Sequence, residues 1–186
     1  PEAFATLEAQ ASACRNALPQ ARAPVLAGWS YGALLAWEVA RQSERDGVEI
    51  GGLVMIDPPL PQGDADAEAP VDFEEMMRRE LALGRDADPG RSAALSASPE
   101  ARAVLAACRA NTRRLRAYRP SGRLSCSAFL AVATRRPPAW GDAEAVTRAW
   151  REHLGALRDQ IALPGTHYDC VLGDNAAAVA RLLRSL

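Results

Sequence analysis

The stretch Pro24-Val-Leu-Ala-Gly28-Trp29-Ser30-Tyr31-Gly32 decides how this chain folds. It opens with a short apolar run that predicts a buried strand, and a Gly-x-Ser-x-Gly sequence follows at residues 28–32. From Ala33 to about Arg45, apolar residues recur at helical spacing. The pattern therefore predicts a strand, a sharp turn that carries Ser30, and a helix.

Strands and helices alternate on both sides of this turn. An amphipathic helix pattern covers Glu2–Leu18, and Gly51–Ile56 has the pattern of a second buried strand. The C-terminal part predicts a strand, a crossover helix, a strand and a final helix, at Cys126–Ala133, Asp142–Leu157, Gln160–Leu163 and Asn175–Leu183. This alternation predicts an α/β fold with a mostly parallel, doubly wound sheet.

The segment from about residue 62 to residue 119 has a different character. It carries acidic and Ser/Ala/Pro/Gly-rich loops and two helical patterns, Val71–Leu83 and Pro99–Ala117. An insertion of this length between two strands predicts a helical lid on a single domain that spans residues 1–186. Lid residues would shape a pocket, and candidates for its apolar lining are Met76, Met77, Leu81, Leu105 and Leu115.

Composition excludes several classes of function. The net charge is −1, and 22 basic residues are interspersed with 23 acidic ones, so the sequence has no basic cluster of the kind that binds nucleic acid. All the basic residues are arginines, which excludes lysine Schiff-base chemistry. The four cysteines show no CxxC spacing, so neither a metal site nor a disulfide framework is expected. No apolar run reaches the roughly 18 residues of a membrane span, and we expect a cytoplasmic protein.

Ser30 is the candidate nucleophile. Glycines at positions 28 and 32 are expected to let the strand and the helix approach closely around a strained turn. The serine hydroxyl then lies at the carboxyl edge of the sheet, and the backbone N–H of Tyr31 is placed to stabilise a tetrahedral oxyanion. Loss of one such donor typically costs about 3–4 kcal/mol.

A serine needs a histidine base to become a good nucleophile, and the chain has two histidines. His153 falls within the predicted crossover helix, where a solvated or packed structural role is expected. His167 follows the apolar run Ile161–Leu163 and the helix breakers Pro164-Gly165. It is therefore predicted on a loop at the same sheet edge as Ser30.

Two carboxylates compete to orient the histidine. Asp57 ends the strand that follows the serine helix, and Asp142 follows the next strand, where many hydrolases of this architecture place the acid. The sequence Trp140-Gly-Asp142 also has the pattern of a helix N-cap, which explains Asp142 without catalysis. We favour Asp57 and keep Asp142 as the alternative.

Longer motifs carry a family resemblance. The stretches Gly28–Gly32, Leu35–Arg41 and Met55–Pro61 together resemble a type I thioesterase domain, which has the α/β-hydrolase fold. Asn111–Pro120 is similar to the last lid helix of that family, and Pro164–Tyr168 is similar to its histidine loop.

The resemblance implies release of an acyl or peptidyl chain from a nonribosomal peptide or polyketide synthase, by hydrolysis or macrocyclisation. It transfers the role of the acid to Asp57, whereas stand-alone editing thioesterases usually have it at the position of Asp142. The substrate would arrive on the phosphopantetheine of a carrier domain, with no cofactor bound by this domain itself. Candidate substrate contacts are Trp29, Pro58, Met76, Met77 and Asn111. The alternatives are an editing thioesterase or carboxylesterase, and a non-catalytic scaffold.

One departure from the family concerns its N-terminal strands. The family has further strands before the first helix, and one of their loops supplies a second oxyanion donor. This sequence contains neither, so we expect a sheet without those strands and assign no second donor.

Overall fold

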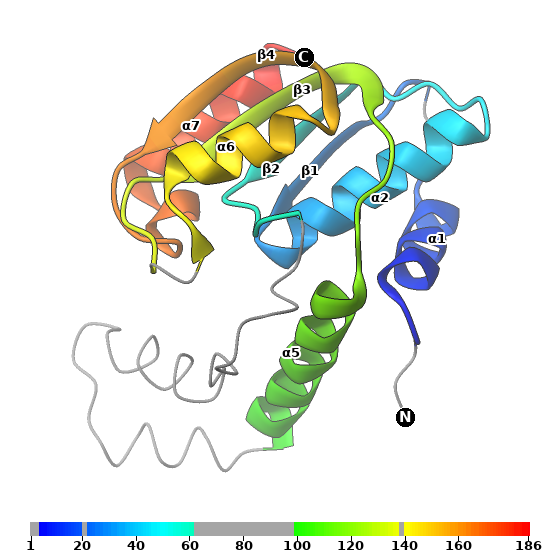
Figure 1. Cartoon of the computed structure of the whole chain (residues 1–186), viewed down its shortest axis with the longest axis horizontal. Helices are drawn as coiled ribbons and strands as arrows, with labels where there is room; N and C mark the ends of the chain where they lie inside the picture. Colours follow the sequence, from blue (N-terminus) through cyan, green and yellow to red (C-terminus); the bar gives the residue numbers. More distant parts are fainter. Residues whose placement is uncertain (1–3, 20–21, 62–98, 138–139) are drawn as a thin grey trace.

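In the part of the chain that the structure describes, four parallel strands form one sheet, in the same order as in the sequence. The computed structural model describes residues 4–19, 22–61, 99–137 and 140–186. The strands are β1 (Val25–Trp29), β2 (Gly52–Ile56), β3 (Leu124–Ala133) and β4 (Leu154–Leu163) (Figure 1). Trp29 pairs with Ile56, Ile56 with Ala131, and Ala131 with Ile161. This register brings the segments after the carboxyl ends of the strands to a common edge, where Ser30, Asp57 and His167 follow.

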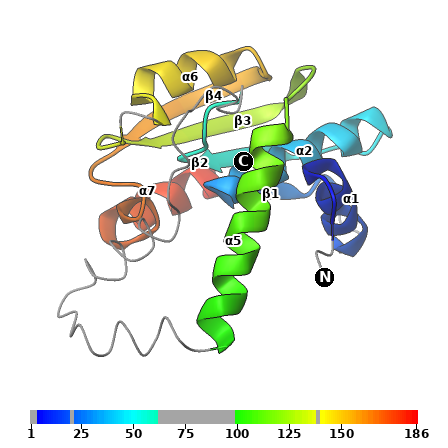
Figure 2. The same ribbon diagram turned by 60° about the horizontal axis from the view of Figure 1, so that its bottom comes forward.

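Helices cover both faces of the sheet (Figures 1 and 2). α2 (Tyr31–Arg45) and α6 (Ala143–Arg151) lie on one face, and α7 (Gly173–Arg184) lies on the other. α1 (Leu7–Ala17) packs against α2, and α5 (Pro99–Ala117) projects away from the sheet. None of the helices in these described ranges is long and apolar enough to cross a membrane.

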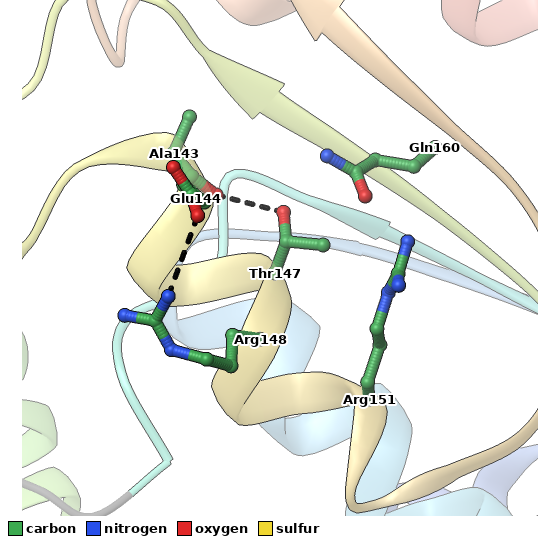
Figure 3. A pocket seen from close by; sticks show the side chains of 6 residues that line it. All are labelled: Ala143, Glu144, Thr147, Arg148, Arg151 and Gln160. Atoms are coloured by element: carbon green, nitrogen blue, oxygen red, sulfur yellow. Dashed lines mark hydrogen bonds and ion pairs between the residues drawn. The ribbon is translucent and has the colours of Figure 1, made fainter.

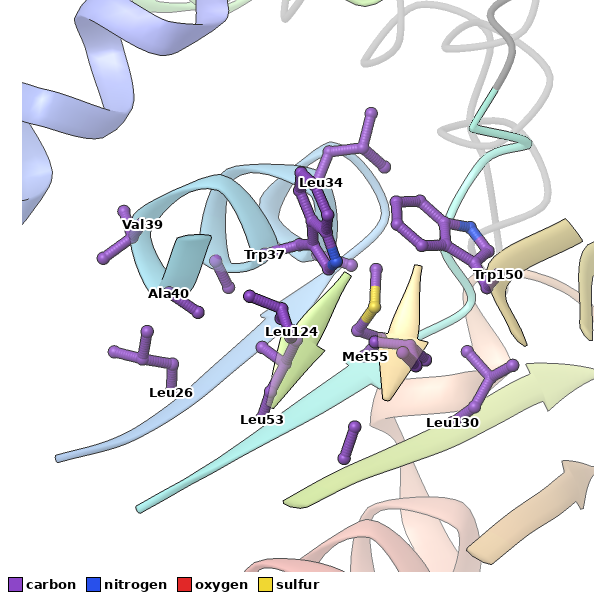
Figure 4. Packing of buried hydrophobic residues seen from close by; sticks show 14 of the residues in the cluster. Leu26, Leu34, Trp37, Val39, Ala40, Leu53, Met55, Leu124, Leu130 and Trp150 are labelled. Atoms are coloured by element: carbon purple, nitrogen blue, oxygen red, sulfur yellow. The ribbon is translucent and has the colours of Figure 1, made fainter. Parts of the chain in front are cut away.

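The core follows the two-residue period of the strands. In β2, Leu53 and Met55 point into the cluster beneath α2 and α6, whereas Val54 and Ile56 point toward α7. All five residues of β2 are buried, as expected for an inner parallel strand. Figure 4 shows Met55 below Trp37 of α2 and Trp150 of α6, two indoles that are fully buried. The predicted α/β class with a parallel sheet is confirmed.

The first helix is shorter than predicted. It begins after Thr6, whose side chain accepts a hydrogen bond from the Ala9 backbone N–H at 3.1 Å. Its end agrees better with the sequence, because Leu18 is extended before Pro19. The apolar pattern extends further than the helix because an N-cap, and not hydrophobic spacing, sets where a helix begins.

The boundary between α6 and β4 was predicted wrongly. The predicted helix Asp142–Leu157 ends at Arg151, and the predicted strand Gln160–Leu163 begins at Leu154. Pairing with β3 starts at Leu124 and Leu154, so ladder hydrogen bonds override a local pattern that fits a helix. His153 therefore lies in the turn between the two elements and not in a helix.

Part of the predicted lid is described. α5 has the predicted bounds, and Leu115 packs against the core. The predicted helix Val71–Leu83, with Met76, Met77 and Leu81, lies outside the described residues, as does the side chain of Leu105.

Candidate active site

Ser30 occupies a strained turn between β1 and α2. Its backbone has φ 57° and ψ −127°, a region that L-residues rarely adopt, and its N–H donates to the Ile56 carbonyl at 2.9 Å. At Gly28, a Cβ would lie 2.0 Å from the Gly32 carbonyl oxygen. Glycine is therefore required at position 28 for the strand and the helix to meet around the serine.

The second glycine of the motif behaves differently. A Cβ built at Gly32 has no atom within 4 Å, and Gly32 has no positive φ. The expectation that both glycines permit the close approach is correct for Gly28 and wrong for Gly32. The turn is crowded only where the strand meets the backbone of the first helical turn.

Asp57 and His167 form a buried hydrogen-bonded pair. Asp57 Oδ2 lies 2.6 Å from His167 Nδ1, and the two side chains are 0% and 8% exposed. Asp57 directly follows β2 and also has a positive φ, 43°. Its backbone N–H donates to the Ala131 carbonyl at 2.7 Å, which anchors it to the neighbouring strand.

Arg136 is a site residue that the sequence reasoning missed. Its Nη1 is hydrogen-bonded to Asp57 Oδ1, and its side chain is only 2% exposed. The guanidinium also donates from Nε to the Gly141 carbonyl at 3.0 Å and from Nη2 to the Pro58 and Trp140 carbonyls. The one available signal was the pair Arg135-Arg136, which follows β3 after Thr134, at the edge where the acid was expected.

The surroundings keep the Asp57 carboxylate ionised. Burial by itself raises its pKa, but hydrogen bonds from His167 and from the Ala133 N–H, together with the charge of Arg136, hold the pKa below its usual value. Burial and the Asp57 charge raise the pKa of the nearby Cys170 thiol to about 12. The site thus holds a carboxylate beside a protonated thiol.

Aromatic rings enclose the His167 imidazole. Trp29 stacks on it with ring centroids 4.8 Å apart, and Trp140 and Tyr168 approach edge-on at 5.1 and 5.2 Å. The Trp29 indole N–H also donates to the His167 carbonyl at 3.2 Å. Trp29, a candidate substrate contact, therefore packs on both the ring and the backbone of this histidine.

The loop that carries His167 is tied by its own side chains. Asp169 Oδ2 accepts from the Thr166 N–H at 2.6 Å and from the Thr166 hydroxyl at 2.8 Å. Asn175 donates to the Pro164 and Asp169 carbonyls. Gly165 has φ 111°, and a Cβ there would meet Asp169 side-chain atoms. These contacts define the path of the loop between β4 and α7.

The competing histidine and acid have structural partners. His153 Nδ1 lies 3.1 Å from the Gly122 carbonyl oxygen, and its ring meets Trp37 and Trp150 edge-on. Asp142 is the N-cap of α6 and accepts from the Ala145 N–H at 2.7 Å. No hydrogen bond or ring contact in the described part of the chain joins His153 or Asp142 to His167 or Asp57, whereas Asp57 and His167 contact each other.

The remaining candidates lie on three different elements. Tyr31, at the start of α2, donates its hydroxyl to Gln10 of α1 at 2.8 Å. Pro58 is buried beside Arg136. Asn111 of α5 accepts from Arg114 at 3.0 Å. Met76 and Met77 lie outside the described residues.

A pocket of about 550 Å³ lies elsewhere on the surface (Figure 3). It runs beside α6 and β4, and its lining contains none of the site residues above: it consists of Ala143, Glu144, Thr147, Arg148, Arg151 and Gln160. Since Arg148 and Glu144 form an exposed i,i+4 pair there, we interpret this hollow as a groove along a solvated helix.

Solved structures share this fold. The RedJ thioesterase from the prodiginine biosynthetic pathway in Streptomyces coelicolor has a TM-score of 0.72 and 26% identity, covering 98% of this chain and 69% of that one. The NocB thioesterase domain, in covalent complex with a fluorophosphonate nocardicin G analogue, has a TM-score of 0.72 and 26% identity, covering 99% and 75%. BorB, a type II thioesterase from the borrelidin biosynthetic cluster, has a TM-score of 0.66 and 22% identity, covering 96% and 70%.

A comparison with curated protein sequences gave no match. The family model described as Thioesterase domain matches residues 2–186. Together with the structural matches, this confirms the resemblance to synthase thioesterases and the α/β-hydrolase fold. The chain belongs to the thioesterase domain family of hydrolases.

Proposed function

We propose that this domain releases an acyl or peptidyl chain from the phosphopantetheine thioester of a carrier protein, through an acyl intermediate on Ser30. The observation that carries the proposal is the buried 2.6 Å contact between Asp57 and His167, at the sheet edge where Ser30 lies on its strained turn. These three residue types form the Ser-His-Asp set of serine hydrolases.

In the first half of the reaction, His167 Nε2 takes the proton of the Ser30 hydroxyl. The serine oxygen attacks the thioester carbonyl carbon, and the Tyr31 backbone N–H stabilises the negative oxygen that forms. The carbon–sulfur bond then breaks, and His167 returns the proton to the departing phosphopantetheine thiolate. The products of this half are an acyl-serine and a free thiol.

In the second half, another nucleophile displaces the serine. Water gives a free acid, and a hydroxyl or amine within the acyl chain gives a ring. His167 removes the proton of the incoming nucleophile and returns it to the Ser30 oxygen. Asp57 orients the imidazole through Nδ1 and stabilises its positive charge in both halves.

The carrier protein supplies the phosphopantetheine arm, so the domain needs no metal or cofactor of its own. We place the carrier domain in the same polypeptide, as in the type I thioesterases that the sequence resembles. Trp29 and Asn111 remain proposed substrate contacts, and Trp29 can serve in this way only through the surface that it does not use against His167.

A stand-alone editing thioesterase is the second candidate. BorB, a type II thioesterase, has the same fold. The position of the acid favours chain release, because Asp57 contacts His167 and Asp142 caps α6. A carboxylesterase would use the same residues on an oxygen ester, and a binding scaffold would use none of them.

Intact mass spectrometry tests the proposal. The protein and its Ser30→Ala variant are incubated with acyl pantetheine thioesters and, in parallel, with matched oxygen esters. We expect an acyl adduct or product from thioesters in the parent protein alone. A fluorophosphonate probe, the class of reagent bound to NocB, should label Ser30.

Preference for the oxygen esters would favour a carboxylesterase. Absence of adduct, product and fluorophosphonate label in a folded protein would refute a catalytic role for Ser30. Incubation with acyl chains loaded on a free carrier protein separates chain release from editing. An editing thioesterase should prefer short, aberrant chains to a full-length product.

A further inference from the structure

We propose that Arg136 is a positioning residue. Its guanidinium holds one oxygen of Asp57 and leaves the other to His167, and its positive charge limits how strongly the carboxylate favours a protonated imidazole. This inference rests on the proposed function of Ser30, Asp57 and His167 and adds a residue to it.

The contacts of the guanidinium leave it little freedom. Nε, Nη1 and Nη2 all donate hydrogen bonds, to Gly141, to Asp57 and to the Pro58 and Trp140 carbonyls. A fork with fixed donors can satisfy such partners at the same time, which a lysine ammonium cannot. Arg136 therefore fastens the loop after β2 to the loop that precedes α6.

The two carboxylate oxygens of Asp57 have separate partners. Oδ1 accepts from Arg136 and from the Ala133 N–H at 3.0 Å, and Oδ2 lies against His167 Nδ1. Because Oδ1 is held from two sides, the carboxylate plane is fixed and Oδ2 points at the imidazole. Arg136 also binds the carbonyl of Trp140, whose ring meets His167 edge-on, so it supports the histidine from a second direction.

The pairing also has an electrostatic consequence. A bare buried carboxylate strongly favours a protonated imidazole beside it, and a protonated imidazole cannot act as a base. A buried cation on the far oxygen offsets part of that attraction. Among the described residues, the other titratable groups near this pair are the buried thiol of Cys170, which is uncharged, the Tyr168 ring, whose centroid lies 5.2 Å from that of His167, and the exposed ion pair of Arg135 with Asp169 at 3.7 Å.

The test compares Arg136→Gln and Arg136→Lys with the parent protein. In Arg136→Gln we expect the acidic limb of the kcat/KM pH profile to move upward by about 1 pH unit or more, because a nearby charge is removed. Activity at the optimum should fall by up to about 100-fold as the carboxylate loses its orientation. Arg136→Lys restores the positive charge but not the planar set of donors. The acidic limb of its kcat/KM profile should therefore return toward that of the parent protein, while its activity at the optimal pH should stay low.

Arg135→Gln is the matched control. Arg135 is the neighbouring arginine, and its side chain is 73% exposed. Because solvent screens the charge of Arg135, the acidic limb of the Arg135→Gln profile should lie at the same pH as in the parent protein. If Arg136→Gln has a lower kcat but an unmoved limb, or if Arg135→Gln moves the limb equally, the proposal is wrong and Arg136 is structural.

A readout without turnover separates this proposal from the proposed function. The chain has two histidines, so NMR can follow the His167 ring signals against pH in a Ser30→Ala background, with His153→Gln for assignment. We expect Arg136→Gln to move the titration of the His167 ring to higher pH. An unmoved titration overturns the role of Arg136, whether or not the parent protein cleaves thioesters.

Discussion

Ser30 and Asp57 carry their side chains on backbones with positive φ, at 57° and 43°. Such conformations typically cost about 1–3 kcal/mol each and persist only where surrounding contacts impose them. Here those contacts are hydrogen bonds to the adjacent strands, from Ser30 to Ile56 and from Asp57 to Ala131. At the residue scale, the sheet thus holds a nucleophile candidate and an acid candidate in strained but defined positions.

The two candidate acids are separated by replacing each with Asn. Asp57→Asn should lower thioester turnover by about 10³–10⁴-fold, because an amide does not hold the imidazole in the required tautomer. Asp142→Asn should be nearly silent, since Asn caps a helix about as well as Asp. Steady-state kinetics on folded protein provides the measurement. Loss of turnover in Asp142→Asn alone would reverse the assignment and favour the editing arrangement.

The strand-turn-helix element depends on one close backbone approach. The β1 backbone at Gly28 passes so near the first turn of α2 that a methyl group there would overlap the Gly32 carbonyl. The N–H of Ala33 closes the turn by donating to the Ser30 carbonyl at 2.9 Å. At the element scale, the geometry of Ser30 is therefore a property of how β1 meets α2.

Alanine at each glycine tests this view. Gly28→Ala should lower the free energy of unfolding by at least about 2 kcal/mol, because backbone atoms must move to admit the methyl group. Gly32→Ala, in open space within α2, should change it by less than about 1 kcal/mol or improve helix propensity. Urea denaturation of both variants measures the difference. Equal effects at the two positions would contradict the geometry.

A buried polar network joins distant parts of the molecule. Glu38 of α2 is 0% exposed, and Tyr118, just after α5, donates its hydroxyl to the Glu38 carboxylate at 2.6 Å. Arg41 and Gln42 donate to the same carboxylate. Burial opposes ionisation, but these hydrogen bonds outweigh it and hold the pKa of Glu38 below its usual value. At the scale of the whole molecule, this network secures the end of α5 to the sheet body.

Tyr118→Phe should therefore destabilise the protein by about 1–3 kcal/mol at pH 7, since a buried carboxylate loses a donor. A carboxylate with a lowered folded-state pKa stabilises the protein above its unfolded pKa of about 4.3 and loses that contribution as the pH falls. The difference between parent and variant should thus shrink below about pH 4. Chemical denaturation at several pH values checks this, and a difference independent of pH would show that the hydrogen bond to Glu38 is not its source.

Local sequence patterns determined the strand-turn-helix around Ser30, the bounds of α5 and the parallel α/β class. Each of these features depends on the spacing of apolar residues and on the glycines and prolines within one contiguous stretch. They also named Asp57 and His167 as candidates, since both follow apolar runs that end at one sheet edge. The start of β4 was missed because its register is decided by β3, which lies about 30 residues away in the sequence.

Only the tertiary structure decided which candidates meet. The sequence left Asp57 and Asp142 in competition, and the fold brings Asp57 to His167 while Asp142 caps α6. Arg136 had only the arginine pair after β3 as a sequence signal and the aromatic enclosure of His167 had none, because the contacting residues come from β1 and from the loops after β2, β3 and β4. Contacts across a sheet edge depend on strand register and loop path, which hydrophobic periodicity does not encode.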